Sequence, residues 1–273
     1  MPRLILLTAV FFFANWGSFA QKKDPGQLVS PIISQVLKFS ENNGQWPENV
    51  LFKSTLDGGS IFIEKNCMTF SFYDKKKLRD IHHSGMAKGI YKNSDIKGHA
   101  YRVLFEGCNK DVRIEKLQPG QDYENFFLGS DKNKWKGNVR NYHQVWIRNL
   151  YNGIDYEALT AANGIKYNFY LKPGAKTEDI KIKYEGIDKM KLKEGSLFLK
   201  LEIGEVKEQK PFAYQMIDGK VKIVSCRYKL NDNVLNFDFP DGYDKNYEII
   251  IDPVLIFAAQ SGSLADNFGM TAT

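Results

Sequence analysis

Short apolar segments recur along the chain from Asn49 onward, and turn residues separate them. Within each segment apolar and polar residues alternate, which is the pattern of a β-strand that buries one face. A segment that starts like a helix at Thr177 returns at once to alternation from Ile180 to Tyr184. The pattern therefore predicts an all-β protein with little helix, an antiparallel β-sandwich built as one large sandwich or as two packed smaller ones.

Turn dipeptides test this prediction, because both arms of a hairpin must place their apolar residues on the same face. Asn163-Gly164 favours a two-residue type I′ turn, in which both positions need a positive φ. Pairing outward from this turn places Ala162 opposite Ile165 and Thr160 opposite Tyr167. One face of the hairpin is then largely apolar and the other mostly polar, so we expect Gly164 at the turn.

Three further hairpins are predicted at Lys65-Asn66, Glu194-Gly195 and Asp218-Gly219, with Gly195 and Gly219 as turn residues. We expect their apolar pairs to face the core. After the third hairpin the apolar phase shifts to Val224 and Cys226, which indicates a β-bulge near Val224. The expected pairs, turn by turn, are Ile63 with Met68 and Ile61 with Phe70, Leu192 with Leu197 and Met190 with Leu199, and Met216 with Val221 and Tyr214 with Ile223.

Residues 1–20 have the pattern of a secretory signal peptide. An apolar core of eleven residues follows Arg3, and the small residues Ser18 and Ala20 precede the cleavage site that we expect after Ala20. Eleven apolar residues are too few for a membrane span, which needs about 20. We therefore predict export through the inner membrane, a secreted or cell-surface location, and no membrane span after cleavage. Residues 21–38 are interpreted as a leader segment.

Composition narrows the class of protein. A chain of 273 residues with 43% hydrophobic content has enough apolar side chains to exclude a disordered protein. The three cysteines, Cys67, Cys108 and Cys226, are too sparse for a disulfide framework, and their odd number leaves at least one unpaired or bridged to another chain. We expect buried free thiols, with one disulfide as the alternative.

The formal net charge is +6, and acidic residues lie near the lysine runs such as Lys75-Lys76-Lys77 and counter their charge. We interpret these runs as solvated surface. Export removes the protein from chromosomal and ribosomal nucleic acid, so no nucleic-acid partner is expected. Attraction to an acidic polysaccharide or an anionic cell surface stays an alternative, and cell-surface polysaccharide or other surface proteins are the partners considered.

Motifs for catalysis or metal binding do not emerge from the sequence. His82 and His83 are adjacent, so on a strand they point to opposite faces and cannot jointly bind an ion. Asp131 opens a segment that starts like a calcium loop, but lysines interleave and no acidic ligand occupies the twelfth position at Tyr142. We expect an Asx-stabilised turn there instead. The sequence therefore indicates no catalytic residue, cofactor site or metal ligand.

Tryptophans are the remaining candidates for a binding role. Trp46 and Trp135 have loop-like sequence contexts, where an exposed ring could stack on a sugar. Trp146 lies in the strand-like segment Val145-Trp146-Ile147, and we interpret it as structural.

Several phrases of the mature chain occur in a specific order and spacing. They are Phe39-Ser-Glu-Asn-Asn-Gly-Gln-Trp46, Tyr123-Glu-Asn-Phe-Phe-Leu-Gly129, Asn149-Leu-Tyr-Asn-Gly-Ile-Asp155, Ile165-Lys-Tyr-Asn-Phe-Tyr-Leu-Lys-Pro-Gly174, Lys210-Pro-Phe-Ala-Tyr-Gln215 and Ile249-Ile-Ile-Asp-Pro-Val-Leu255. Together they resemble the uncharacterised N-terminal domain that precedes SBBP-type (β-propeller) repeats in large bacterial surface proteins. The resemblance implies an exported, often gliding-motility-associated or adhesin-like protein of Gram-negative bacteria, and it carries over no catalytic residue.

This resemblance also suggests a domain organisation. Residues 39–253 are predicted to form the β-sandwich N-terminal domain, with a subdivision considered near Pro173. Residues 254–273 resemble the start of a truncated repeat region.

Three functions remain open. The first is a non-catalytic structural or interaction module of a secreted or cell-surface protein. The second is a carbohydrate-binding module that uses Trp46, Trp135 or loop tyrosines. The third is a glycan-directed hydrolase, which requires a concave pocket that holds two close, partly buried acids.

Overall fold

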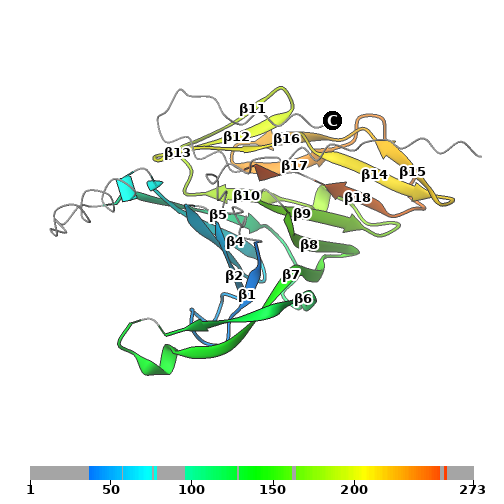
Figure 1. Cartoon of the computed structure of the whole chain (residues 1–273). Coiled ribbons are helices and arrows are strands. Elements are labelled where there is room, and N and C mark those ends of the chain that lie inside the picture. The colour runs from blue at the N-terminus through cyan, green and yellow to red at the C-terminus, as the bar shows by residue number, and fades with distance from the viewer. Residues whose placement is uncertain are drawn as a thin grey trace, which may run out of the picture. The chain divides into compact units, whose positions relative to one another are not determined.

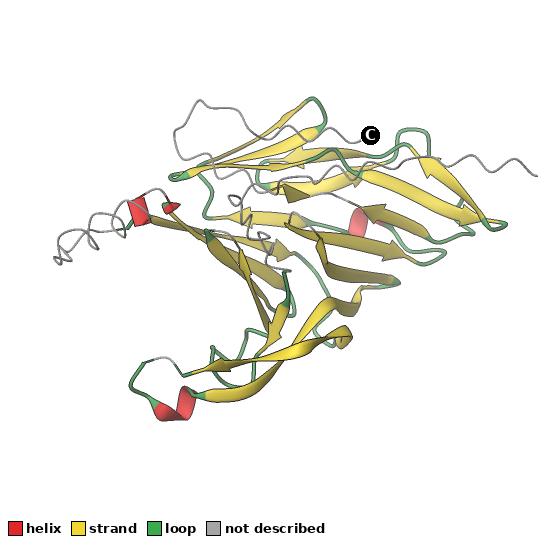
Figure 2. Ribbon diagram, viewed as in Figure 1, coloured by secondary structure: helices red, strands yellow, loops and turns green. Residues whose placement is uncertain are grey.

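The computed structural model describes residues 37–56, 58–75, 77–78, 96–127, 129–161, 164–252 and 255–256. The predicted signal peptide, nearly all of the leader and most of the predicted repeat start lie outside these residues. The described elements are almost entirely antiparallel strands (Figures 1 and 2), which confirms the predicted all-β class. Among them no helix is long and apolar enough to cross a membrane.

The first nine strands are β1 (Phe39–Glu41), β2 (Phe52–Leu56), β3 (Gly59–Ile63), β4 (Cys67–Tyr73), β5 (Gly98–Phe105), β6 (Arg113–Phe126), β7 (Lys136–Tyr151), β8 (Ile154–Ala161) and β9 (Gly164–Leu171). The later strands are β10 (Ile182–Glu185), β11 (Lys189–Lys193), β12 (Ser196–Leu201), β13 (Gly204–Glu208), β14 (Phe212–Ile217), β15 (Lys220–Val224), β16 (Arg227–Asn231), β17 (Val234–Asp238), β18 (Ile249–Asp252) and β19 (Leu255–Ile256). Two short 3-10 helices are η1 (Lys132–Lys134) and η2 (Thr177–Asp179).

The strands form one large sheet and one small sheet. In the described residues the large sheet has fifteen strands in the order β15-β14-β18-β9-β8-β7-β1-β2-β3-β4-β5-β10-β17-β16, with β6 paired to β7. Strands from both sides of Pro173 pair within it, for example β9 with β18. Although β15 and β16 stand at opposite ends of this order, only Ser225 and Cys226 separate them in sequence. The large sheet must therefore curl back until its two ends meet, which makes two layers from one sheet.

Aromatic side chains fill the space between these layers. Phe105 of β5 lies against Tyr156 of β8, with 5.0 Å between ring centroids, and Phe237 of β17 lies 5.8 Å from Phe169 of β9. The two strands of each pair are distant in the sheet order, so these contacts cross the interior. Facing layers with an aromatic core agree with the predicted sandwich.

The small sheet, β11-β12-β13-β19, is joined to the same core by a buried carboxylate. Glu208 of β13 accepts hydrogen bonds from the hydroxyl groups of Tyr167 in β9 (2.9 Å) and Tyr184 in β10 (2.7 Å). Burial raises the pKa of Glu208, and the tyrosine hydroxyl groups oppose this shift without cancelling it. Leu197 and Leu199 of β12 are fully buried beside this contact.

Three of the four predicted hairpin registers are confirmed. At the second and third of these turns the residue before the glycine also has a positive φ, 51° at Glu194 and 49° at Asp218, which is the type I′ conformation. The observed pairs that match the prediction are Ile63 with Met68 and Ile61 with Phe70, Leu192 with Leu197 and Met190 with Leu199, and Met216 with Val221 and Tyr214 with Ile223.

The register predicted around Asn163-Gly164 is wrong by two residues. Ile165 pairs with Thr160 instead of Ala162, and Gly164 pairs with Ala161 as the first residue of β9. The connecting residues 162 and 163, which include part of the predicted turn, lie outside the described residues. Since a shift of two preserves the side-chain alternation, each residue keeps its predicted face.

The apolar face of the β14–β15 hairpin lies outside the core, which corrects the expectation that it would be buried. Phe212, Met216, Val221 and Ile223 are 43%, 49%, 60% and 70% exposed. The opposite face is buried through Ala213, Gln215 and Val224. The Gln215 amide explains this choice of face, because it binds the backbone of the loop that leads to β18.

The β-bulge predicted near Val224 is also wrong. β15 ends at Val224, and the chain crosses through Ser225 and Cys226 to β16, which pairs with β17. The shift in apolar phase therefore marks the end of one hairpin and the start of another.

The raised pKa of Glu208 makes stability depend on pH. A carboxyl whose folded pKa lies above its unfolded value, about 4.5, contributes stability that is fully present below that value and is lost as pH rises through the folded pKa. The Glu208→Gln variant lacks this titration. We expect the stability of this variant relative to the native chain, measured by urea titration, to increase as pH rises above about 4.5.

The control for this experiment is Glu194→Gln, at an exposed turn residue. Its stability relative to the native chain should stay constant over the same pH range. A constant difference for Glu208→Gln would contradict the assignment.

Candidate binding surfaces

The β6–β7 hairpin ends in the loop that contains η1 (Figure 1). Both candidate tryptophans contact aromatic residues where β6 enters this loop. Trp46 packs edge-on against Phe126, with 5.1 Å between ring centroids. Trp135 packs against Phe127 at 5.8 Å. Because consecutive residues of an extended chain point to opposite sides, the two tryptophans lie on different sides of the hairpin end.

The side with Trp135 presents exposed aromatic rings. Phe127 and Trp135 are 57% and 38% exposed, and Tyr123, earlier in β6, is 60% exposed. The indole Nε1 of Trp135 donates a hydrogen bond to the carbonyl of Gly129 at 3.1 Å, so the ring is held in place. The Asp131 carboxylate accepts from the backbone amide at position 133 at the start of η1, which confirms the predicted Asx turn.

The loop between β1 and β2 positions Trp46 through one amide side chain. Asn42 donates to the carbonyls of Pro47 (2.9 Å) and Val50 (2.7 Å), and its oxygen accepts from the backbone amides of Gly44 and Trp46. Gly44 has φ +104°, a conformation that side chains rarely adopt. These contacts explain why Asn42 and Gly44 occur at their positions in the segment from Phe39 to Trp46.

The outer face of the large sheet holds a polar network that sequence reasoning missed. The buried carboxylate of Glu157 accepts hydrogen bonds from Gln144, from Asn168 at 2.7 Å and from Tyr170 at 2.6 Å. These residues come from β7, β8 and β9, and only the cross-strand register brings them together. The oxygen of Asn168 is buried and has no hydrogen-bond partner in the described residues.

Trp146 belongs to this outer face. The Arg148 guanidinium lies 3.7 Å from its ring centroid, and the ring of Tyr170 lies 4.5 Å away. Trp146 is buried by these neighbours, which agrees with the structural role inferred for it. Its ring is not an open stacking platform.

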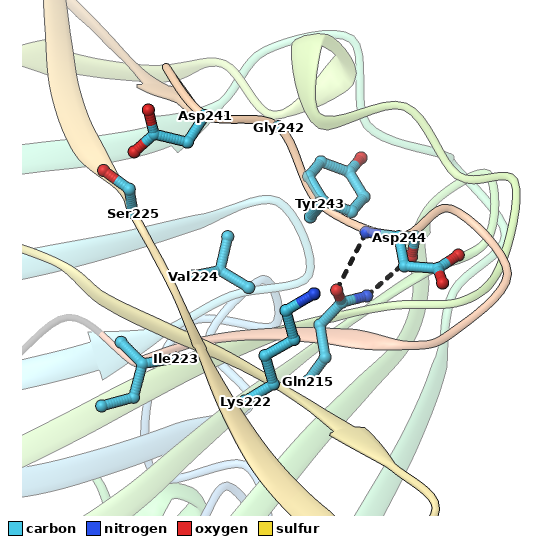
Figure 3. A pocket seen from close by; sticks show the side chains of 9 residues that line it. All are labelled: Gln215, Lys222, Ile223, Val224, Ser225, Asp241, Gly242, Tyr243 and Asp244. Atoms are coloured by element: carbon cyan, nitrogen blue, oxygen red, sulfur yellow. Dashed lines mark hydrogen bonds between the residues drawn. The ribbon is translucent and has the colours of Figure 1, made fainter.

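A cleft of about 520 Å³ lies between β15 and the loop before β18 (Figure 3). The Gln215 side chain turns toward this loop, where its amide donates to the Asp244 carbonyl at 2.7 Å and accepts from the Asp244 amide at 3.0 Å. Its polar atoms are therefore used to hold the loop. Asp241 is exposed, so the cleft does not supply the pair of partly buried acids that a hydrolase requires.

The three cysteines are free thiols, as expected. Cys67 is buried, whereas Cys108 and Cys226 are half-buried. Burial raises the pKa of Cys67 to about 11 and that of Cys226 to about 12, so both are protonated and weakly nucleophilic near neutral pH.

Histidines do not gather with other ligands in the part of the chain that the structure describes, and no group of three or more His, Cys, Asp and Glu side chains could hold a metal ion there. His82 and His83 lie outside it. His99 makes a 2.6 Å contact with the Gly186 carbonyl, and His143 makes a 3.1 Å contact with the Leu37 carbonyl.

A family described as a domain of unknown function, DUF7948, matches residues 39–254. The chain belongs to this family. The DUF7948 region begins at the first residue of β1 and includes every strand through β18, so it contains both the sandwich and three strands of the small sheet. No curated protein and no solved structure matches the chain.

Proposed function

We propose that the DUF7948 region is a non-catalytic interaction module of an exported bacterial protein, either secreted or held at the cell surface. The signal-peptide pattern of residues 1–20 supports export. The resemblance to domains that precede SBBP-type repeats supports a position at the N-terminal end of a larger surface protein.

The observation that carries this proposal is the exposed apolar face of the β14–β15 hairpin. Phe212 and Met216 of β14 share this face with Val221 and Ile223 of β15. Met216 pairs with Val221, and Phe212 and Ile223 lie an even number of residues from them along their own strands. Contiguous apolar side chains on a solvated surface mark an interaction site, since their burial by a partner releases water.

The position of β15 indicates how a partner binds. In the described residues β15 has a strand neighbour on one side only, so its other edge offers free backbone amides and carbonyls. An extended segment of another surface protein can add there as a further strand. Its apolar residues then lie beside Val221 and Ile223, and acidic residues at alternate positions lie beside Lys220 and Lys222 on the opposite face.

A second candidate function, carbohydrate recognition, is favoured by the exposed rings of Tyr123, Phe127 and Trp135. Rings on a projecting hairpin are accessible to an extended glycan, and the hydrogen bond from Trp135 to Gly129 orients one of them before binding. Binding to a pre-ordered ring loses less side-chain entropy.

The proposed protein interaction is tested with washed cell envelopes of the producing bacterium. The mature chain should sediment with untreated envelopes, and Val221→Ser/Ile223→Ser should reduce the bound fraction at least fivefold because it removes exposed apolar contacts. Leu117→Ser, at another exposed apolar position, is the matched control and should bind like the native chain. Protease treatment of the envelopes should remove the part of the binding that depends on Val221 and Ile223. Equal binding by the native chain and the double variant contradicts the proposal.

Carbohydrate recognition is tested by tryptophan fluorescence during titration with a panel of neutral oligosaccharides. A ligand that stacks at the hairpin end should change the emission of the native chain, and Trp135→Phe should abolish that change. Trp46→Phe, on the other side of the hairpin end, should preserve it. A flat response across the panel, or a response that survives Trp135→Phe, sets this function aside.

A further inference from the structure

The small sheet has one apolar face and one strongly basic face. Its core side carries the leucines of β12, whereas cross-strand pairing gathers the basic residues on the other side. One row of that side joins Lys191 of β11 to Phe198 of β12 and Lys207 of β13. A second row joins Lys189 of β11 to Lys200 of β12 and Glu205 of β13. Lys193 of β11 lies on the same side. We call these five lysines with Phe198 the lysine face.

Few acidic residues lie near the lysine face, so most of its positive charge is not compensated. Glu205 is the one acidic residue in the two rows, and Lys193 forms a 3.9 Å ion pair with Glu194 in the adjoining turn. Within the described residues no carboxylate forms an ion pair with Lys189, Lys191, Lys200 or Lys207. The lysine face therefore holds much of the positive excess that gives the chain its formal net charge of +6.

The clustered lysines repel one another and so lower the stability of the fold, and the fold itself does not require them. Lys189 and Lys200 are directly opposite each other, and like charges at such positions repel. Lysines on β11 can be explained as protection of an edge strand. That explanation does not extend to Lys200 and Lys207, because β12 and β13 each have a strand neighbour on both sides.

The geometry of the lysine face suits a polymer with repeated negative charges. Side chains on one face repeat about every 7 Å along a strand and about every 5 Å between strands, so the ammonium groups form a grid. Lys191 and Lys207 reach the ring of Phe198 from both sides, with Nζ 5.8 and 5.4 Å from its centroid. An anionic ligand can draw both ammonium groups away from the ring and leave Phe198 to pack against the apolar side of a sugar.

We propose that the lysine face binds an acidic polysaccharide, an extended glycan that carries carboxylate or sulfate groups. This proposal rests on export in the proposed function, since export places the domain among envelope polysaccharides and away from nucleic acid. A lipid surface fits less well, because the two rows contain no exposed large apolar side chain to insert between lipids. The lysine face is distinct from the β14–β15 hairpin, so the two proposals can fail separately.

Fluorescence anisotropy of labelled polygalacturonate and heparin, with neutral dextran as the uncharged probe, tests the proposal on the full mature chain. The native chain should bind both acidic polymers, ignore dextran and lose affinity as salt rises. Lys191→Glu/Lys207→Glu should weaken binding roughly tenfold or more, because it replaces two positive charges that attract the polymer with two negative charges that repel it. Lys191→Arg/Lys207→Arg keeps the charge and should keep the affinity.

Lys110→Glu/Lys245→Glu is the matched control, with the same change in net charge at exposed loop positions outside the small sheet. It should bind nearly as the native chain does, and thermal melts should show all variants folded. Equal losses from the two charge-reversal variants would show a general charge effect and overturn the proposal. Tighter binding to single-stranded oligothymidine, or to vesicles rich in phosphatidylglycerol, would also overturn it in favour of nucleic acid or lipid.

Discussion

A carboxylate enclosed between two sheets can remain there only if hydroxyl or amide groups satisfy its oxygens, and this constraint organises the domain. Glu208 meets it with one tyrosine on each oxygen, Tyr167 on one and Tyr184 on the other. The two tyrosines come from opposite layers of the curled large sheet, and the glutamate comes from the small sheet. The hydrogen bonds of Glu208 therefore connect the small sheet to both layers of the large sheet. It also determines which side of β13 faces inward, and so it turns the lysine face outward.

The alternation of residues predicted a large part of this fold, because the arms of each confirmed hairpin have matching phase. Two of these hairpins also have turn residues with a positive φ, at Glu194-Gly195 and Asp218-Gly219. The register after Ala161 could not be obtained in this way. A shift of two residues leaves every face unchanged, so the pattern does not distinguish the two pairings. The observed pairing places Tyr156 opposite Phe169, with 5.4 Å between ring centroids, whereas the predicted register would place Ala158 there. Aromatic packing in the core outweighed the turn preference of Asn163-Gly164.

The candidate surfaces were harder to predict for a related reason. Alternation shows which residues share a face, but it does not show which face meets the core. In β14 the face with Ala213 and Gln215 is buried, because the Gln215 amide binds the backbone of a distant loop. The more apolar face with Met216 is therefore left to solvent. In the same way Lys191 and Lys207 are 16 residues apart in sequence and share a row only through the pairing of three strands.

The most direct test of this account is a double-mutant cycle between Glu208→Gln and Tyr184→Phe, with stability measured by urea unfolding. If the buried hydrogen bond joins the small sheet to the large one, the two substitutions are coupled. The account predicts a coupling energy of about 1 kcal/mol or more. Strictly additive effects, with no coupling beyond experimental error, would contradict it.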